Sequence, residues 1–392
     1  MITREDLKAA IRTAIRRAQV TTVLGSRQCG KTTIAREIGG EAGAEFFDME
    51  DPVSLKRLEE PMISLAGLKG LVVIDEAQRM PGLFPVLRVL ADRTPLPARF
   101  LLTGSASPDL IRGVSETLAG RVEFIEMAGF SLLEVGPEVL RRLWWRGGLP
   151  RAFMARTNDD CRGWQEAFIR TFLERDLRMM GIDAPPVRMR NLWSMLAHYH
   201  GGTWNASDVA RSLGVSPPTA QHYLEILCGS FAVRQLQPWY DNIEKRQRKA
   251  PKVFVRDSGL LHALLGVKTF RDLEGHPRLG FSWQGFVIEE IIKIVGERQV
   301  YSWGTHSGAE LDLLVFHRGK RYGVEVKYAD APGMTKSMHS AIDDLKLDQL
   351  LVAYPGTQPY LLSRGVEVLP LPALLERFRR GGGSKRGSKA VA

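Results

Sequence analysis

Residues 25–32 read Gly-Ser-Arg-Gln-Cys-Gly-Lys-Thr, a loop with two glycines that ends in a lysine and a hydroxyl residue. An apolar stretch at residues 20–24 precedes the loop, and residues 32–38 have helix-forming character. Gly25 and Gly30 let the backbone curl so that its N–H groups converge, and converging N–H groups can bind phosphate oxygens. The stretch therefore predicts a strand, a phosphate-binding loop of the Walker A type and a helix.

The end of this loop supplies the groups that a bound polyphosphate requires. Lys31 can reach the β- and γ-phosphate oxygens, and the Thr32 hydroxyl can bind Mg²⁺. The positive N-terminal end of the following helix adds to the attraction for anions. Arg27 could contact either a phosphate or an acidic neighbour. We expect the nucleotide to bind the whole loop, namely Gly25, Ser26, Arg27, Gln28, Cys29, Gly30, Lys31, Thr32 and Thr33.

A short apolar run that ends in two carboxylates follows downstream. Residues 71–76 read Leu-Val-Val-Ile-Asp-Glu, as expected of a buried parallel strand. Ligands of open α/β sheets bind at the carboxyl ends of the strands, where Asp75 would hold the Mg²⁺ and its water shell. Glu76 would polarise the attacking water. Together with the loop, this Walker B segment indicates a magnesium-dependent enzyme that hydrolyses a nucleoside triphosphate.

Residues 99–105 form a third apolar run, which ends in hydroxyl residues. Thr103 or Ser105 could orient the γ-phosphate or the catalytic water from a neighbouring strand, and a plain strand ending in a turn is the alternative. Residues 118–121 then read Leu-Ala-Gly-Arg. Arg121 could act as an arginine finger toward the nucleotide of an adjacent subunit in a homo-oligomer, or it could be a structural surface residue.

Three buried strands that alternate with helices across residues 20–128 predict an α/β domain with a parallel sheet. The motifs GSRQCGKTT, LVVIDEAQ, LLTGSAS and LAGR, followed by FSLLE, GGLP and FLERDL, resemble a family of prokaryotic AAA-type ATPases. Members of this family carry a C-terminal region of unknown function. The resemblance implies ATP as the nucleotide, and it implies a winged-helix unit and a restriction-endonuclease-like fold after the P-loop NTPase domain.

Residues 207–227 have the pattern of a helix-turn-helix. Ser207 and Ser216 could cap its two helices, and Gly214 permits the tight turn between them. The residues expected on the exposed face of the second helix are Thr219, Gln221, His222 and Glu225. This face therefore carries no Arg or Lys that could read guanine edges. A basic stretch downstream is suited to phosphate contact, so we expect any DNA binding to be nonspecific and to use Lys245, Arg246, Arg248 and Lys249. A purely structural role between the other domains is the alternative.

Residues 309–315 and 322–327 read as two strands joined by a turn. The first carries Asp312, and the second carries Glu325 and Lys327, which is the core of the PD-(D/E)xK nuclease arrangement. The two carboxylates could chelate a second divalent metal, and Lys327 could steady the scissile phosphate or activate water. A degenerate site with a salt bridge between Glu325 and Lys327 is the favoured alternative.

One departure counts against nuclease activity. Nuclease folds of this kind usually carry a glutamate on the preceding helix, here predicted at residues 283–295. Relatives show Trp-Glu-Gly-Phe where this chain has Trp-Gln-Gly-Phe at residues 283–286. Gln284 cannot supply the negative charge, although Glu289 or Glu290 could compensate.

The length of 392 residues fits two or three domains. The net charge is +10, but about half of the excess lies in a glycine-rich terminal segment, which leaves a weak signal for nucleic acid. We expect an AAA-type P-loop ATPase domain at 1–130, a helical and winged-helix domain at 131–256, a restriction-endonuclease-like α/β domain at 257–376 and a basic disordered tail at 377–392.

The three cysteines show no pairing or metal-binding spacing, which fits a reducing compartment. No run of 18 apolar residues exists, and the N-terminus lacks the apolar core of a signal peptide. We therefore expect a cytoplasmic protein without a membrane partner.

Three functions remain compatible with the sequence. The first is an ATPase whose cycle is coupled to a C-terminal winged-helix and nuclease-like module that acts on DNA. The second is a nucleotide-gated switch that recruits a protein partner without DNA chemistry. The third is a metal-dependent DNase that ATP regulates.

Overall fold

The computed structural model describes residues 2–105, 114, 116–179, 182–240 and 250–380, and these fall into two compact units. Neither unit is a continuous stretch of chain. The first lies within residues 1–130, 146–193 and 209–233, and the second lies within residues 131–145, 194–208 and 234–392. This grouping differs from the three consecutive domains expected from the sequence, whose boundaries stay a prediction.

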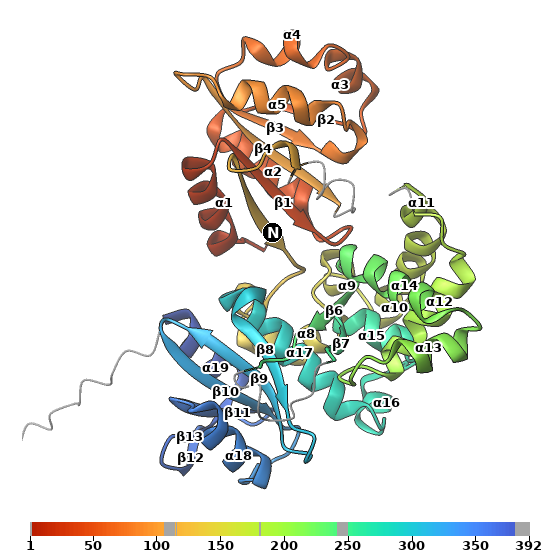
Figure 1. Cartoon of the computed structure of the whole chain (residues 1–392), viewed down its shortest axis with the longest axis vertical. Helices are drawn as coiled ribbons and strands as arrows, with labels where there is room; N and C mark the ends of the chain where they lie inside the picture. Colours follow the sequence, from red (N-terminus) through yellow and green to blue (C-terminus); the bar gives the residue numbers. More distant parts are fainter. Residues whose placement is uncertain (1, 106–113, 115, 180–181, 241–249, 381–392) are drawn as a thin grey trace, which may run out of the picture. The chain divides into compact units, whose positions relative to one another are not determined.

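Among the described residues of the first unit, five parallel strands form a sheet in the order β2-β3-β4-β1-β5 (Figure 1). The strands are β1 (Val20–Gly25), β2 (Glu45–Asp48), β3 (Gly70–Asp75), β4 (Ala98–Ser105) and β5 (Val122–Met127). The three runs read as strands from the sequence are the three central ones, β1, β3 and β4. Strands β1, β4 and β3 are parallel neighbours, so their carboxyl ends lie at the same end of the sheet. The phosphate-binding loop after β1 and the Walker B carboxylates of β3 therefore lie at this end, on either side of β4.

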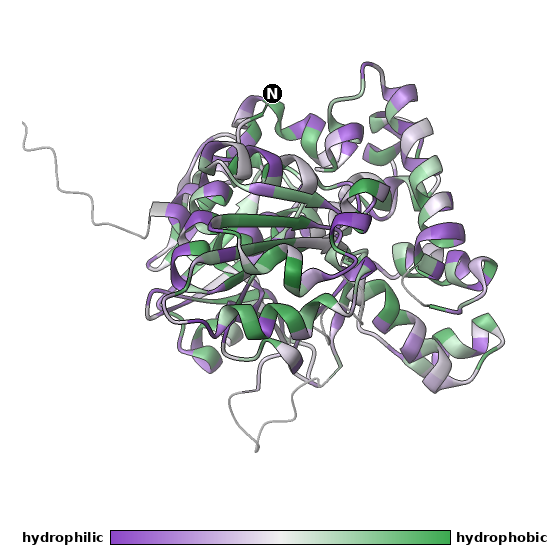
Figure 2. Ribbon diagram, turned by 90° about the horizontal axis from the view of Figure 1, so that it is seen from above, coloured by the Kyte–Doolittle hydropathy of each residue, from purple (hydrophilic) through white to green (hydrophobic). Residues whose placement is uncertain are grey.

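Helices cover both faces of this sheet. Strands that are buried on both sides carry long hydrophobic stretches, drawn green in Figure 2. Helix α1 (Glu5–Arg17) precedes β1. The elements that connect the strands are α2 (Lys31–Ala42), α3 (Pro52–Arg57), α4 (Pro61–Ala66), the short 3-10 helix Ala77–Arg79 and α5 (Leu83–Ala91).

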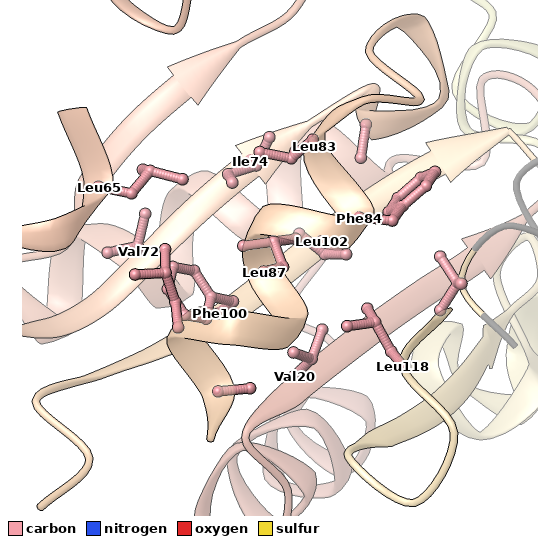
Figure 3. Packing of buried hydrophobic residues seen from close by; sticks show 14 of the residues in the cluster. Val20, Leu65, Val72, Ile74, Leu83, Phe84, Leu87, Phe100, Leu102 and Leu118 are labelled. Carbon is pink, nitrogen blue, oxygen red and sulfur yellow. The ribbon is translucent and has the colours of Figure 1, made fainter. Parts of the chain in front are cut away.

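Helix α5 packs its apolar side onto the sheet. Leu83 and Leu87 point toward Ile74, Phe100 and their neighbours on β3 and β4, and all of these side chains are almost fully buried (Figure 3). A single large-to-small substitution in such a core costs about 2–5 kcal/mol of folding free energy. This packing fixes the carboxyl end of β3, which carries the Walker B residues.

The rest of the first unit is helical. A π-helical turn, Phe172–Asp176, interrupts the run between α10 and α11. The helices after the sheet are α9 (Pro150–Phe153), α10 (Asn158–Thr171), α11 (Leu177–Met179), α12 (Pro186–His198), α13 (Ala206–Leu213) and α14 (Pro217–Gly229). The end of α12 from residue 194 and the start of α13 up to residue 208 are grouped with the second unit.

Two helices joined by a short turn, α13 and α14, lie where the sequence predicts a helix-turn-helix at residues 207–227. Gly214 adopts a left-handed conformation in the turn, with φ of 63°, and the Ser216 hydroxyl accepts a hydrogen bond from the backbone N–H of Thr219. The cap expected from Ser207 is wrong. Asn205 supplies it instead, because its side-chain oxygen accepts from the N–H groups of Ser207 and Asp208.

The second unit contains a six-stranded mixed sheet among its described residues, in the order β12-β13-β11-β10-β9-β8. Its strands are β8 (Val300–Gly304), β9 (Glu310–His317), β10 (Lys320–Val326), β11 (Gln349–Tyr354), β12 (Tyr360–Ser363) and β13 (Val366–Pro370). Strands β8, β9 and β10 form an antiparallel meander, whereas β10, β11 and β13 run parallel. The two strands read from the sequence, β9 and β10, are neighbours in this sheet.

The helices of the second unit flank this sheet. Helix α18 contributes Met338, Ala341 and Leu345 to the core formed with β9 and β11. A separate two-stranded sheet is made by β6 (Val233–Leu236) and β7 (Lys252–Val255). The helices are α7 (Leu132–Val135), α8 (Leu140–Arg146), α15 (Ser258–Leu264), α16 (Phe270–Glu274), α17 (Leu279–Val295), α18 (Lys336–Leu345) and α19 (Leu371–Arg380).

The start of the predicted tail can be compared with these elements directly. The predicted tail begins too early, because residues 377–380 continue α19 and Phe378 is buried. The remainder of the tail, and the predicted DNA contacts Lys245, Arg246, Arg248 and Lys249, lie outside the described residues. Within the described ranges, the structure contains no helix that is long and apolar enough to cross a membrane.

Candidate nucleotide-binding site

The Walker A segment forms the connection between β1 and α2 that the sequence predicts (Figure 1). Gly25 ends β1 so close to β5 that a Cβ atom there would lie 2.1 Å from the carbonyl oxygen of Met127. Gly30 has a φ of 103°, a conformation that side-chain-bearing residues rarely adopt, and α2 begins directly after it. Both glycines are therefore required for the shape of the loop.

Lys31 is buried at the start of α2 and folds back over the loop. Its Nζ atom donates hydrogen bonds to the carbonyl oxygens of Gly25 and Ser26, at 3.1 and 3.0 Å. A buried ammonium group needs polar partners, and phosphate oxygens are stronger partners than carbonyl oxygens. The ammonium is thus held at the loop, where it can exchange a carbonyl for a phosphate.

Asp75 lies at the end of β3 and is only 1% exposed. Burial raises the pKa of this carboxyl, while hydrogen bonds from the Thr103 and Thr32 hydroxyls act in the opposite direction. Thr103 on β4 donates to Asp75 Oδ1, so it positions this carboxylate and does not itself line the cavity at the loop. Thr103 thus holds Asp75, and its contact with phosphate or water stays a prediction. The side chain of Ser105 lies outside the described part.

The hydroxyl of Thr32, the carboxylate of Asp75 and the ammonium of Lys31 meet at this end of the sheet. A hydroxyl and a carboxylate are the oxygen ligands that Mg²⁺ takes from proteins when it also binds phosphates. The buried carboxylate, already hydrogen-bonded to Thr32, makes this donor set fit a magnesium–nucleotide complex.

Glu76 follows Asp75 in a left-handed conformation, with φ of 55°. Non-glycine residues rarely adopt this conformation, and it turns the chain sharply at the end of the strand. The Glu76 side chain accepts a hydrogen bond from the amide of Gln78 and lines the cavity at the loop. Two adjacent carboxylates thus take different positions: Asp75 is buried in the sheet, and Glu76 faces the cavity.

A cavity of about 610 Å³ lies over the loop, within the size range of small-molecule sites. One side carries charged and polar residues of the loop and of the strand ends. The other side is formed by segments that are distant in sequence, and it is lined by Ile2, Arg4, Met127, Phe130, Pro150, Arg151 and Met154. Sequence reasoning missed this second side. Phe130 and Pro150 belong to the FSLLE and GGLP stretches, but those stretches carried only the family resemblance, and the other residues belong to no quoted motif.

Arg4 and Phe130 are held in place by their own contacts. The Arg4 guanidinium donates to the carbonyl oxygens of Ala128 and Gly129, at 3.1 and 3.2 Å, and lies 5.5 Å from the centre of the Phe130 ring. Phe130 also packs edge-on against Phe153. The cavity thus combines an anion-binding loop with a wall of mostly apolar side chains that also includes Arg4 and Arg151.

Arg121 lies at the amino-terminal end of β1, whereas the loop follows its carboxyl end. Its backbone oxygen accepts from Val20 at the start of β1, about 17 Å along the strand from Gly25 at about 3.3 Å per residue. Its guanidinium makes two hydrogen bonds to Asp92, at 2.6 and 2.9 Å. Arg121 therefore does not reach the cavity of its own chain, and its action on an adjacent subunit stays a prediction.

The second unit brings together the predicted nuclease residues. Glu325 on β10 forms an ion pair of 2.7 Å with Lys327, which is the contact expected of a degenerate site. Burial and the neighbouring Asp312 raise the pKa of Glu325 to about 7. Asp312 on β9 has both oxygens bonded, to the amide of Gln284 at 2.5 Å and to the backbone N–H of Val326 at 2.8 Å.

Glu289 and Glu290, the two residues that could compensate for Gln284, have other partners. Glu289 pairs with Arg234, and Glu290 accepts from Leu132 N–H and Lys293 Nζ. Across the described ranges, no group of three His, Cys, Asp or Glu side chains could hold a metal ion. The site offers two carboxylates, with the amide of Gln284 where related folds carry a glutamate, and nothing in the described residues supports a second divalent metal there.

Comparison with known proteins divides the chain in sequence order. A family model described as an AAA domain matches residues 17–136. Two models described as domains of unknown function, DUF8612 and DUF4143, match residues 137–271 and 279–374. In fold, the chain is similar to the Walker-type ATPase PABY2304 of Pyrococcus abyssi, at 16% identity and a TM-score of 0.47, over 67% of this chain and 96% of that chain.

Two mycobacterial proteins match almost the whole chain. They are the uncharacterized proteins Rv2008c of Mycobacterium tuberculosis and Mb2031c of Mycobacterium bovis, each 49% identical over 375 residues. The match covers 96% of this chain and 85% of each relative. The chain belongs to the family of these two proteins, and its N-terminal part is an AAA-type P-loop domain, which supports nucleotide hydrolysis.

Proposed function

We propose that this family member is a magnesium-dependent ATPase whose nucleotide cycle drives a C-terminal module that interacts with DNA. One observation carries the ATPase part. A fully buried carboxylate, Asp75, is held by Thr103 beside a complete phosphate-binding loop, while Glu76 faces the cavity over that loop. A buried carboxylate is costly unless it binds a cation or donors, so its position favours a metal–triphosphate ligand.

Each residue of the site has a separate role in binding or hydrolysing the nucleotide. Lys31 exchanges its loop carbonyls for phosphate oxygens and neutralises their charge. Thr32 and Asp75 would hold the Mg²⁺, which supplies charge stabilisation across the phosphates when bound. Glu76 accepts the proton of the attacking water and orients that water toward the terminal phosphate. The apolar wall of Met127, Phe130 and their neighbours would take the base.

The DNA-interacting part rests on the helix-turn-helix of α13 and α14 and on the two-stranded sheet that follows it in sequence. This order of elements is the one expected of a winged helix. His222 and Glu225 are exposed on α14, and the N-terminal half of that helix offers no cation to base edges. We therefore expect binding through phosphate contacts, without sequence preference.

ATP hydrolysis by the full chain is expected to rise when single- or double-stranded DNA is added, and the stimulation should weaken as salt increases. Phosphate contacts release counterions, so raising salt from about 50 to 200 mM weakens them steeply. The measurement is the steady-state release of phosphate at these two salt concentrations. Lys31→Ala, which removes the phosphate-binding ammonium, should give no hydrolysis under any condition.

If wild-type hydrolysis occurs but responds to neither DNA at either salt concentration, the DNA coupling is wrong. A nucleotide-gated switch that recruits a protein partner would then be the better description of the family member.

The chain is not expected to act as a metal-dependent DNase. The two oxygens of Asp312 are already bonded to Gln284 and Val326, and Glu325 is paired with Lys327. Purified protein with Mg²⁺ or Mn²⁺ should leave supercoiled plasmid intact, with or without ATP. Nicking that disappears in Asp312→Ala would contradict this expectation, whereas nicking that persists in that variant would indicate a contaminant.

A further inference from the structure

Arg27 occupies the third position of the phosphate-binding loop and forms an ion pair with an acidic residue more than a hundred residues away. Its Nε atom lies 3.0 Å from Oδ2 of Asp176. The two side chains differ in exposure, because that of Arg27 is 26% exposed and that of Asp176 is 2% exposed. The cation can therefore move toward the cavity, while the carboxylate cannot reach water.

Asp176 is the last residue of the π-helical turn between α10 and α11. Its second oxygen, Oδ1, is buried and has no hydrogen-bond partner among the described residues. Burial raises the pKa of this carboxyl, and the charges of Arg27 and Arg175 oppose that effect. The carboxylate thus depends on Arg27, since removing one partner of a buried pair leaves an uncompensated charge.

The pair lies at the Walker B end of the cavity. Arg27 lines the cavity together with Lys31, Glu50 and Glu76. Glu50 and Glu76 lie close enough to Asp176 to raise its pKa further. Glu76 is the residue proposed to act on the water that attacks the γ-phosphate. Arg27 therefore lies near the expected position of the γ-phosphate, which a triphosphate has and a diphosphate lacks.

We propose that Arg27 leaves Asp176 and binds the γ-phosphate when a nucleoside triphosphate binds, and that the π-helical turn Phe172–Asp176 changes its conformation as a result. The proposal rests on the proposed ATPase function. An arginine binds phosphate oxygens with a planar pair of donors, which makes it a good competitor for the carboxylate. The exchange leaves Asp176 buried without its cation, and the irregular turn is the element that can rearrange. A diphosphate lacks the γ-phosphate, so it leaves the pair intact.

Binding constants for ATPγS and ADP, measured on the full chain by titration calorimetry, test the exchange. Asp176→Asn keeps the shape of the side chain but frees Arg27, so it should tighten ATPγS binding about fivefold or more and change ADP binding less than about twofold. Arg27→Ala should weaken ATPγS binding and leave ADP binding nearly unchanged. In the Arg27→Ala background, Asp176→Asn should have no further effect on ATPγS, because the two residues act as one pair.

Hydrogen exchange of the wild-type chain gives a readout that needs no variant. Amides of residues 173–177 should exchange faster with ATPγS bound than with ADP bound. The exchange mechanism is overturned, while the ATPase proposal stands, if Asp176→Asn shifts both nucleotides equally, if its effect persists without Arg27, or if the two nucleotides protect this turn alike. If wild-type protein binds neither nucleotide, both proposals fail together.

Discussion

Glu76→Gln is expected to lower ATP hydrolysis by about two to four orders of magnitude while ATP binding stays within a fewfold of wild type. The substitution keeps the length and the hydrogen-bonding shape of the side chain but removes its ability to accept a proton. Asp75, Thr32 and Lys31 are unchanged, so phosphate and metal binding persist. Single-turnover hydrolysis and equilibrium binding of ATP to the same preparation separate the two effects.

A matched control replaces an exposed carboxylate of the same unit that lies away from the cavity. Glu59→Gln, between α3 and α4, should leave both hydrolysis and binding at the wild-type level. Hydrolysis at the wild-type rate in Glu76→Gln would show that Glu76 does not act on the attacking water. A Glu76→Gln chain that binds ATP, does not hydrolyse it and still functions in the cell would favour the nucleotide-gated switch over a turnover-driven mechanism.

The phosphate-binding half of the site could be predicted because its residues are contiguous. Eight residues of loop and two carboxylates at the end of one apolar strand each carry their spacing in the sequence. The sheet then places both segments at one edge, which follows from the rule for open parallel sheets. The relation of Thr103 to Asp75 depends on the lateral order of β3 and β4, and the sequence does not encode that order locally.

The other half of the cavity could not be predicted. Arg4, Phe130 and Met154 come from three segments without a shared motif, and only the tertiary fold brings them together. The same holds for Asp176, which meets Arg27 across about 150 residues of chain. Such contacts require knowledge of how the helices after the sheet pack, and local periodicity gives no information on that packing.

The missed strands have a different cause. Strand β2 is four residues long and begins and ends in a carboxylate, and the apolar residues of β5 are interrupted by Glu123 and Glu126. Both are edge strands, and edge strands are only partly buried, so they carry charged residues in place of the uncharged, mostly apolar run that identifies β1, β3 and β4. Central strands of a parallel sheet are therefore easier to find in a sequence than its edges.

The largest effect on stability is expected from Glu289→Ala in the second unit. Glu289 on α17 is 5% exposed and binds Arg234 on β6, which is 1% exposed, through contacts of 2.5 and 3.1 Å. Arg256 approaches the same carboxylate at 3.5 Å. Truncation leaves the buried Arg234 and the partly buried Arg256 without their shared anion, so the free energy of unfolding of this unit should fall by about 3–5 kcal/mol. Urea unfolding followed by hydrogen exchange of α17 measures the loss.

The chain offers a control on the same arginine. Glu297 also pairs with Arg234, at 2.8 Å, but its side chain is 52% exposed. Glu297→Ala should therefore cost less than about 1 kcal/mol. Equal losses in the two variants would mean that the number of ion pairs matters and their burial does not.

The pH dependence follows from the same geometry. Burial opposes the ionisation of Glu289, but the attraction of Arg234 and Arg256 prevails and lowers its pKa. A depressed carboxyl pKa contributes stability above the pKa of the unfolded chain, and this stability is lost as the pH falls through the folded value. The difference between wild type and Glu289→Ala should thus be full at pH 7 and shrink only below about pH 4. A difference that shrinks instead between pH 7 and pH 5 would show that Glu289 is protonated near neutrality, and the charge pair would then not be what holds β6 to α17.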